Sequence, residues 1–148
     1  VKTVKAYHVA APNPLQHMLA EPRALGLVVS DGLWARLVDL PGALQARRYL
    51  VSDTLVLEVS DAFCDWNEGR WRISTSGEAG VAEATLEATT DDADLALDTT
   101  DLAAAFLGGP RLLDLAAVGR VRGHTPGAVA RAHALFGYGR EPWCNTMF

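Results

Sequence analysis

The sequence has no excess of positive charge, and this absence limits its possible partners. Its 148 residues carry 13 Lys and Arg against 18 Asp and Glu, which gives a formal net charge of −5. Nucleic acid binding depends on Lys and Arg side chains that neutralise phosphates, and attraction to an anionic membrane needs the same surplus. The composition therefore argues against both kinds of partner.

Cysteine is scarce, and no long apolar run is present. Cys64 and Cys144 are too few for a disulfide framework, so a cytoplasmic location is the default expectation. No stretch approaches the roughly 18 apolar residues that span a bilayer. The opening VKTVKAYHV lacks the apolar core and cleavage site of a signal peptide. Because the chain starts at Val1 rather than Met, we expect it to be a piece of a longer protein.

Apolar residues, by contrast, are plentiful enough for a globular core. They make up 49% of the chain, and charged residues make up 21%, as in ordinary globular domains. The stretch VKTVKAYHV is typical of a short strand. Pro14 and Pro22 can begin and end a short helix over LQHMLAE. We therefore expect residues 1–26 to be a strand and a connector, and residues 27–148 to form the main domain.

Strand and helix patterns follow one another unevenly along residues 27–148. Alternating or β-branched stretches predict five strands: DGLWARLVD, DTLVLEVSD, GRWRIST, VAEATLEATT and DLAL. Stretches with apolar residues at helical spacing predict four helices: LPGALQARRY, TTDLAAAFLGG, RLLDLAAVG and TPGAVARAHALFGYG. Strands that come in succession, with helices clustered late, indicate an α+β fold with a mostly antiparallel sheet.

Several signals place the ends of these elements. Asp39 is a candidate cap for the first helix, and Thr125 is one for the last. Gly108 and Gly119 are expected to end the two helices between them. DTLVLEVSD and GRWRIST should pair as a hairpin, and VAEATLEATT is typical of an edge strand.

The residues that most often carry chemistry do not form a complete set. The histidines show no metal-ligand spacing, and these are His8, His17, His124 and His133. The acidic run that begins at Asp91 fails the spacing of a calcium loop, so we expect a solvated loop followed by helix-capping carboxylates. No metal or cofactor site is therefore predicted within this chain.

Two further candidates have simpler explanations. The string from Arg120 through Gly123 to Thr125 resembles the pyrophosphate loop of GNAT acetyltransferases, but Thr125 stands where that loop needs a small residue. Chance similarity accounts for it better. Cys64 lies beside Phe63 and Trp66, and a buried structural thiol is expected there.

The last residues, PWCNTMF, leave two alternatives open. An α-carboxylate is a weak base in water, with a pKa of about 3.3–3.7. Apolar neighbours such as Trp143 and Met147 would raise that pKa, and the carboxylate of Phe148 could then take a proton from an amine. The alternative is that these side chains only pack the tail onto the domain.

Several long stretches, taken together, resemble a known family. They are DGLWARLVDLPGALQARRY, LVLEVSDAFCDWNEGRWRI, DLALDTTDLAAAFLGG, LAAVGRVRGHTPGAVARAHALF and PWCNTMF. In this order they resemble the C-terminal region of the enhanced-intracellular-survival (Eis) family of acetyltransferases, in which two GNAT domains precede a sterol-carrier-protein-like domain. The resemblance implies that residues 1–26 end a GNAT domain and residues 27–148 form the sterol-carrier-like domain, a small sheet with helices on one face.

The resemblance also implies a function. In this family the terminal carboxylate acts as general base in the acetyl-transfer site of the first domain, and that role would fall to Phe148. The acetyl-CoA site and the Tyr general acid belong to a GNAT domain outside this chain. The implied substrates are primary amines of the aminoglycoside or lysine type. The implied assembly is a homo-oligomer, a hexamer. A stand-alone lipid or sterol carrier and a non-catalytic scaffold are the alternative functions.

Overall fold

The chain divides into two units. The computed structural model describes residues 3–7, 9–10, 13–30, 32–139 and 142–144. One unit, the terminal unit, comprises residues 1–34 together with residues 141–148; the other, the body, comprises residues 35–140. The family resemblance lies mainly in the body, which contains all five strands of the described chain.

The body is built on one mixed sheet with strand order β3-β2-β1-β4-β5. Its strands are β1 (Thr54–Ser60), β2 (Gly69–Ser76), β3 (Glu83–Ala88), β4 (Leu95–Asp98) and β5 (Val121–Gly123). β1 pairs with β4 in parallel, and the other three pairings are antiparallel. The expected α+β class with a mostly antiparallel sheet is thus confirmed, as are the hairpin and the edge position of β3.

The two faces of the sheet differ as their alternating side chains require. Leu55, Leu57 and Val59 of β1 are buried in the core. On the opposite face Glu58 pairs in register with Arg70 of β2. One face is therefore apolar and covered, whereas the other carries charged side chains together with the buried Val56.

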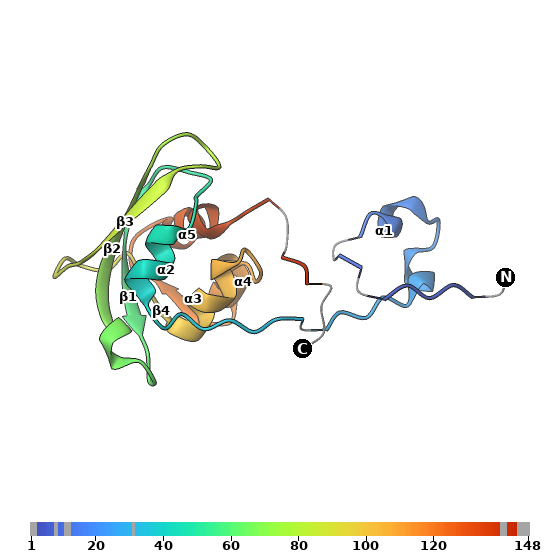
Figure 1. The fold of residues 1–148 in the computed structure, drawn as a ribbon, viewed down its shortest axis with the longest axis horizontal. Coiled ribbons are helices and arrows are strands. Elements are labelled where there is room, and N and C mark those ends of the chain that lie inside the picture. The colour runs from blue at the N-terminus through green and yellow to red at the C-terminus, as the bar shows by residue number, and fades with distance from the viewer. Residues whose placement is uncertain (1–2, 8, 11–12, 31, 140–141, 145–148) are drawn as a thin grey trace. The chain divides into compact units, whose positions relative to one another are not determined.

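Helices cover the apolar face. They are α2 (Leu40–Ala46), α3 (Thr99–Phe106), α4 (Leu112–Ala117) and α5 (Ala128–Phe136), and Figure 1 shows all four on the same side of the sheet. Leu40 and Leu44 of α2 and Leu135 of α5 are fully buried. The expectation that helices lie on one face is confirmed.

The helix ends follow most, but not all, of the sequence signals. The Asp39 side chain accepts a hydrogen bond from the Gly42 backbone N–H at 3.0 Å, as a cap of α2 should. The prediction that Thr125 caps α5 is wrong, because Gly127 occupies that position with φ 77°. The Thr125 hydroxyl instead donates to the Asp94 carboxylate at 2.7 Å. The N-cap of α5 therefore makes no side-chain hydrogen bond.

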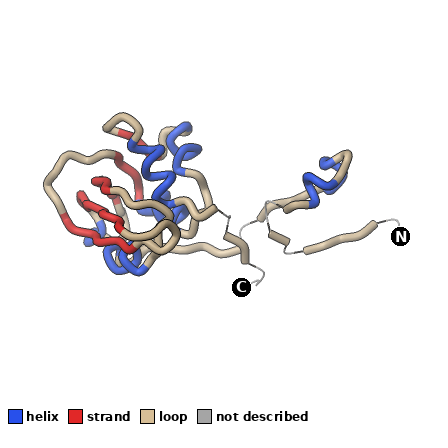
Figure 2. The backbone as a smooth tube through the Cα atoms, turned by 90° about the horizontal axis from the view of Figure 1, so that it is seen from above, coloured by secondary structure: helices blue, strands red, loops and turns tan. Residues whose placement is uncertain are grey.

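The described residues of the terminal unit form short helical turns and extended chain. These turns are α1 (Leu15–Met18) and the 3₁₀ helix η1 (Pro22–Leu25), and neither contains a buried residue. The strands predicted for VKTVKAYHV and for DGLWARLVD are absent from the described residues, and Figure 2 shows only helical turns and loop near the N-terminus. Both predictions were wrong because no partner strand in the described chain pairs with these segments.

Candidate functional site

The proposed catalytic residue, Phe148, lies outside the described residues, as does Met147. The described part of the tail is residues 142–144, in the terminal unit. There the Trp143 side chain is 53% exposed, and Cys144 is half-buried. A Cβ atom on Gly32 would lie 3.2 Å from Cys144 Cβ. The tail therefore passes close to the backbone of the segment that leads into the body.

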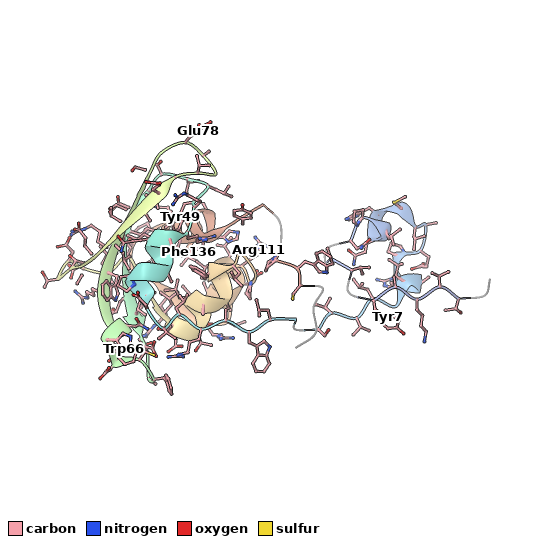
Figure 3. All side chains as sticks on the ribbon, viewed as in Figure 1. Tyr7, Tyr49, Trp66, Glu78, Arg111 and Phe136 are labelled. Atoms are coloured by element: carbon pink, nitrogen blue, oxygen red, sulfur yellow. The ribbon has the colours of Figure 1, made fainter. Side chains whose placement is uncertain are left out.

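Arg47 fixes the end of α5, from which the tail departs. Its Nη2 donates to the backbone carbonyl of Phe136, the last residue of α5, at 2.7 Å. Its guanidinium lies 4.9 Å from the centre of the Tyr49 ring and 5.4 Å from that of the Phe136 ring. Figure 3 labels Tyr49 and Phe136, whose rings meet edge to face at 6.1 Å. A cation at a helix C-terminus is also favoured by the helix dipole.

Burial shapes the proton chemistry of this cluster. It lowers the pKa of Arg47, although the nearby Tyr49 opposes this shift. Burial raises the pKa of Tyr49 to about 12, and the Tyr49 hydroxyl donates to the Leu44 carbonyl at 2.7 Å. Tyr49 therefore stays protonated at neutral pH. The cluster is a structural clamp on α5, and sequence reasoning missed it.

Gly137 follows directly on the clamp. Its backbone N–H donates to the His133 carbonyl at 2.9 Å. A Cβ atom at this position would lie 3.1 Å from that same oxygen. Gly139, two residues further on, has φ 65°, a conformation that favours glycine. These contacts define the direction in which the chain leaves α5.

A second polar cluster holds the loop between β1 and β2. The buried Asp61 carboxylate accepts from the Cys64 backbone N–H at 2.9 Å, the Phe63 backbone N–H at 3.0 Å and Asn67 Nδ2 at 3.0 Å, and it pairs with Arg36. Burial alone would raise the pKa of Asp61, but the hydrogen bonds, that from Cys64 first, hold it well below its usual value. Asp61 is therefore a structural anion.

Asn67 connects this loop to α2. It is fully buried, and its Oδ1 accepts from the Leu40 backbone N–H at 3.1 Å while its Nδ2 donates to the Leu37 carbonyl at 3.0 Å. Asn67 is the last residue of the η2 turn (Asp65–Asn67), so this turn is tied directly to the start of α2. Cys64 is buried, which confirms its expected structural role.

The remaining candidates of the sequence have structural roles. Asp98 accepts from the Thr100 backbone N–H at 2.7 Å and caps α3, as expected of the acidic run. The string that resembled a pyrophosphate loop forms β5, which the sequence analysis missed, and does not open a helix. His133 lines a small pocket, and His124 Nε2 lies 3.9 Å from Glu58 Oε2. The described residues contain no group of three or more potential metal ligands.

The pocket beside α5 is too small for a lipid. It is lined by residues of α3, α4 and α5 and of the loop between α3 and α4, and its volume is about 20 Å³. That volume accommodates about one water molecule. None of the helices in the described residues has the length and apolar character needed to cross a bilayer.

Comparisons with known proteins agree with this fold. The sterol carrier protein domain family matches residues 40–145. An uncharacterized N-acetyltransferase of Streptomyces avermitilis is 46% identical over 132 residues, which are 89% of this chain and 31% of that protein. N-acetyltransferase Eis of Mycobacterium tuberculosis is 33% identical over 84% of this chain and 29% of its own length. This chain therefore spans about a third of the curated relatives that it matches.

A solved structure extends the same similarity to the fold. The crystal structure of Eis1 from Mycobacterium abscessus superposes with a TM-score of 0.76 and 32% sequence identity. The superposition covers 93% of this chain and 34% of that one. The resemblance to the Eis family inferred from the sequence is thereby confirmed.

Proposed function

We propose that this chain is the C-terminal domain of an N-acetyltransferase. The chain belongs to the sterol carrier protein domain family, and it matches about one third of the length of relatives that are named N-acetyltransferase. The whole protein would transfer an acetyl group from acetyl-CoA to a primary amine of the aminoglycoside or lysine type. The observation that carries the proposal is the 46% identity to an N-acetyltransferase across 89% of this chain.

The described residues indicate which part of the reaction this chain would serve. They contain a structural clamp and a buried anion, but no cluster of catalytic side chains. Acetyl-CoA is therefore assigned to a domain outside this chain. Residues 1–26 are assigned to the end of that preceding domain, since their described part has no buried residue. The body would then serve to position the tail.

The chemical contribution proposed for this chain is a general base at Phe148. A lysine-type amine has a pKa near 10.4 and is mostly protonated at neutral pH. It must lose a proton before or as its nitrogen bonds to the acetyl carbonyl and the carbon–sulfur bond breaks. The Phe148 carboxylate would take that proton, and this requires Phe148 to be the last residue of the whole protein.

Changing the length of the tail tests the proposal. In the whole protein, deleting Phe148 or appending one residue moves the carboxylate by about 3.5 Å, beyond hydrogen-bond reach of the amine. We expect kcat to fall about 100-fold, the lower end of the contribution of a general base. The KM for acetyl-CoA should stay the same, because that site lies in another domain.

The matched control is a one-residue insertion beside Glu78, an exposed position in the β2–β3 turn that Figure 3 labels. This insertion changes chain length without moving the tail, so kcat should stay at the wild-type value. Phe148→Leu keeps the carboxylate and should retain most of the activity. Equal turnover for the deletion and the Glu78 insertion would refute the role of the carboxylate.

A lipid carrier is the weaker alternative. A carrier needs a cavity for its ligand, and the pocket beside α5 has a volume of about 20 Å³. A scaffold that joins subunits of a homo-oligomer is compatible with the catalytic proposal.

A further inference from the structure

The body exposes one cluster of large apolar side chains where the chain enters it. Phe63 is 79% exposed, Trp66 is 61% exposed and Val38 is 56% exposed. We call these three residues the aromatic patch. Val38 belongs to the incoming segment, whereas Phe63 and Trp66 belong to the loop between β1 and β2, and Figure 3 shows Trp66 at the margin of the body. We propose that the aromatic patch docks against the acetyltransferase domain that precedes this chain, an inference that rests on the proposed function.

Hydrogen bonds hold the backbone of the loop that carries Phe63 and Trp66. The buried Asp61 carboxylate fixes the backbone N–H groups of Phe63 and Cys64, and fully buried Asn67 anchors the loop to α2. The Arg36 guanidinium lies 4.9 Å from the centre of the Phe63 ring. A loop whose backbone is already held loses less conformational entropy on binding than a free one. Exposed aromatics on a pre-organised loop are what a docking surface requires.

The indole N–H of Trp66 already has a hydrogen-bond acceptor. Trp66 Nε1 donates to the Val38 carbonyl at 2.8 Å, within the patch itself. A partner therefore does not need to supply an acceptor for the indole, and an apolar surface is enough. Trp and other aromatic side chains are also the residues that most often dominate binding energy at interfaces.

The position of the patch indicates which partner would bind it. One of the three residues of the patch, Val38, lies on the incoming segment, which the short linker of residues 27–34 joins to the preceding region. A fully extended linker reaches at most about 3.5 Å per residue, so a preceding domain stays close to the patch at an effective concentration in the millimolar range. Relatives are about three times as long as this chain, which leaves ample structure outside it.

An anionic membrane fits the patch less well. The side chains of Asp65 and Glu68 are exposed beside the aromatics on the same loop. Their negative charges oppose approach to anionic lipid head groups. A protein surface with a polar rim accommodates such charges more readily.

Hydroxyl-radical footprinting of the whole protein and of the 148-residue chain tests the proposal. Residues in the core of an interface lose nearly all their exposed surface, so oxidation of Phe63 and Trp66 should be about fivefold slower in the whole protein. Trp71, whose indole N–H is bound by the Asn67 carbonyl at 2.9 Å, is the internal control and should react alike in both. Equal oxidation of Trp66 in the two proteins would overturn the proposal.

Dilution and lipid vesicles distinguish other occupants. Protection that persists on dilution supports docking within one polypeptide, whereas protection lost on dilution points to a second copy and overturns it. Protection of the 148-residue chain by anionic vesicles alone would also overturn it. The readout is independent of turnover, so it can fail while the Phe148 experiment succeeds, and the reverse.

A paired substitution supplies a second measurement. Phe63→Ser with Trp66→Ser should increase the radius of gyration of the whole protein, because the body is released from its neighbour. The control is Val118→Ser, which alters a 71% exposed side chain beyond the end of α4. Neither change should alter the unfolding of the 148-residue chain appreciably, since both act at exposed positions. An unchanged radius in the paired variant contradicts the proposal.

Discussion

Replacing the buried Asp61 with alanine should destabilise the body more than replacing an exposed carboxylate on its surface. The carboxylate accepts hydrogen bonds from the Cys64 and Phe63 backbone N–H groups and from Asn67 Nδ2, at 2.9, 3.0 and 3.0 Å. Alanine leaves these donors without an acceptor. The bonds to Cys64 and Asn67 are buried, so water cannot replace the lost partner without opening the loop.

The magnitude follows from the number of orphaned donors. Each buried donor left unsatisfied costs about 1–3 kcal/mol, so two of them give about 2–6 kcal/mol. The Arg36 side chain is 38% exposed and can be hydrated, so its loss of a partner adds little. Relief from burying the Asp61 charge favours the lower half of the range. We therefore expect Asp61→Ala to reduce the free energy of unfolding by about 3 kcal/mol.

Urea unfolding of the 148-residue chain measures this value. The matched control is Asp65→Ala, which removes an exposed carboxylate from the same loop and should change stability by less than about 0.5 kcal/mol. In thermal unfolding, a loss of 3 kcal/mol corresponds to about 10 °C. A difference of less than about 0.5 kcal/mol between the two variants would refute the view that Asp61 organises the loop.

The remaining predictions concern ionisation and the clamp on α5. Because Asp61 holds its negative charge more tightly in the folded state, the unfolded chain protonates first as pH falls, so stability should decline below about pH 5 and decline less in Asp61→Asn. Spectrophotometric titration should show a tyrosine that ionises at about 12 and is absent from Tyr49→Phe; the stability linked to it should be lost as pH rises from about 10 through this value. Arg47→Ala should lower stability by about 2 kcal/mol, and Arg47→Lys, which keeps the charge but not the planar fork, should fall between Arg47→Ala and the wild type in urea unfolding.

Local signals predicted the elements whose stability is decided locally. α2 could be placed because Asp39 caps it and Pro41 occupies its first turn. The β1–β2 hairpin could be placed because its two strands lie close in sequence and alternate in polarity. In each case the residues that decide the structure lie within a few positions of it.

Partners distant in sequence decided the elements that were missed. β5 is three residues long and contains Arg122, yet it forms because Val121 pairs with Leu97 of β4. The segment around Trp34 alternates like a strand but does not form one, because no strand in the described chain lies beside it. Alternating polar and apolar side chains show that a segment can form a strand. Whether it does depends on a neighbouring strand with which it can pair.

The candidate site also depends on residues that are distant in sequence. Asp61 and Asn67 bracket a turn-rich loop, but nothing in their spacing shows that both bury their polar groups and reach α2. The Arg47 clamp joins the end of α2 to the end of α5 across 89 positions of sequence. The role of Phe148 came from the family resemblance, because a terminal carboxylate has no motif.

The apolar surface of the described chain has a common explanation. Val4 is 83% exposed, Val28 is 85% exposed and Trp34 is 85% exposed, and no described residue before Leu37 is buried. A segment that buries nothing cannot offset the conformational entropy lost on ordering it. In the longer protein that we propose, contacts outside this chain would set its conformation. The aromatic patch differs in one respect, because hydrogen bonds to Asp61 and from Asn67 already hold the backbone of the loop that carries Phe63 and Trp66.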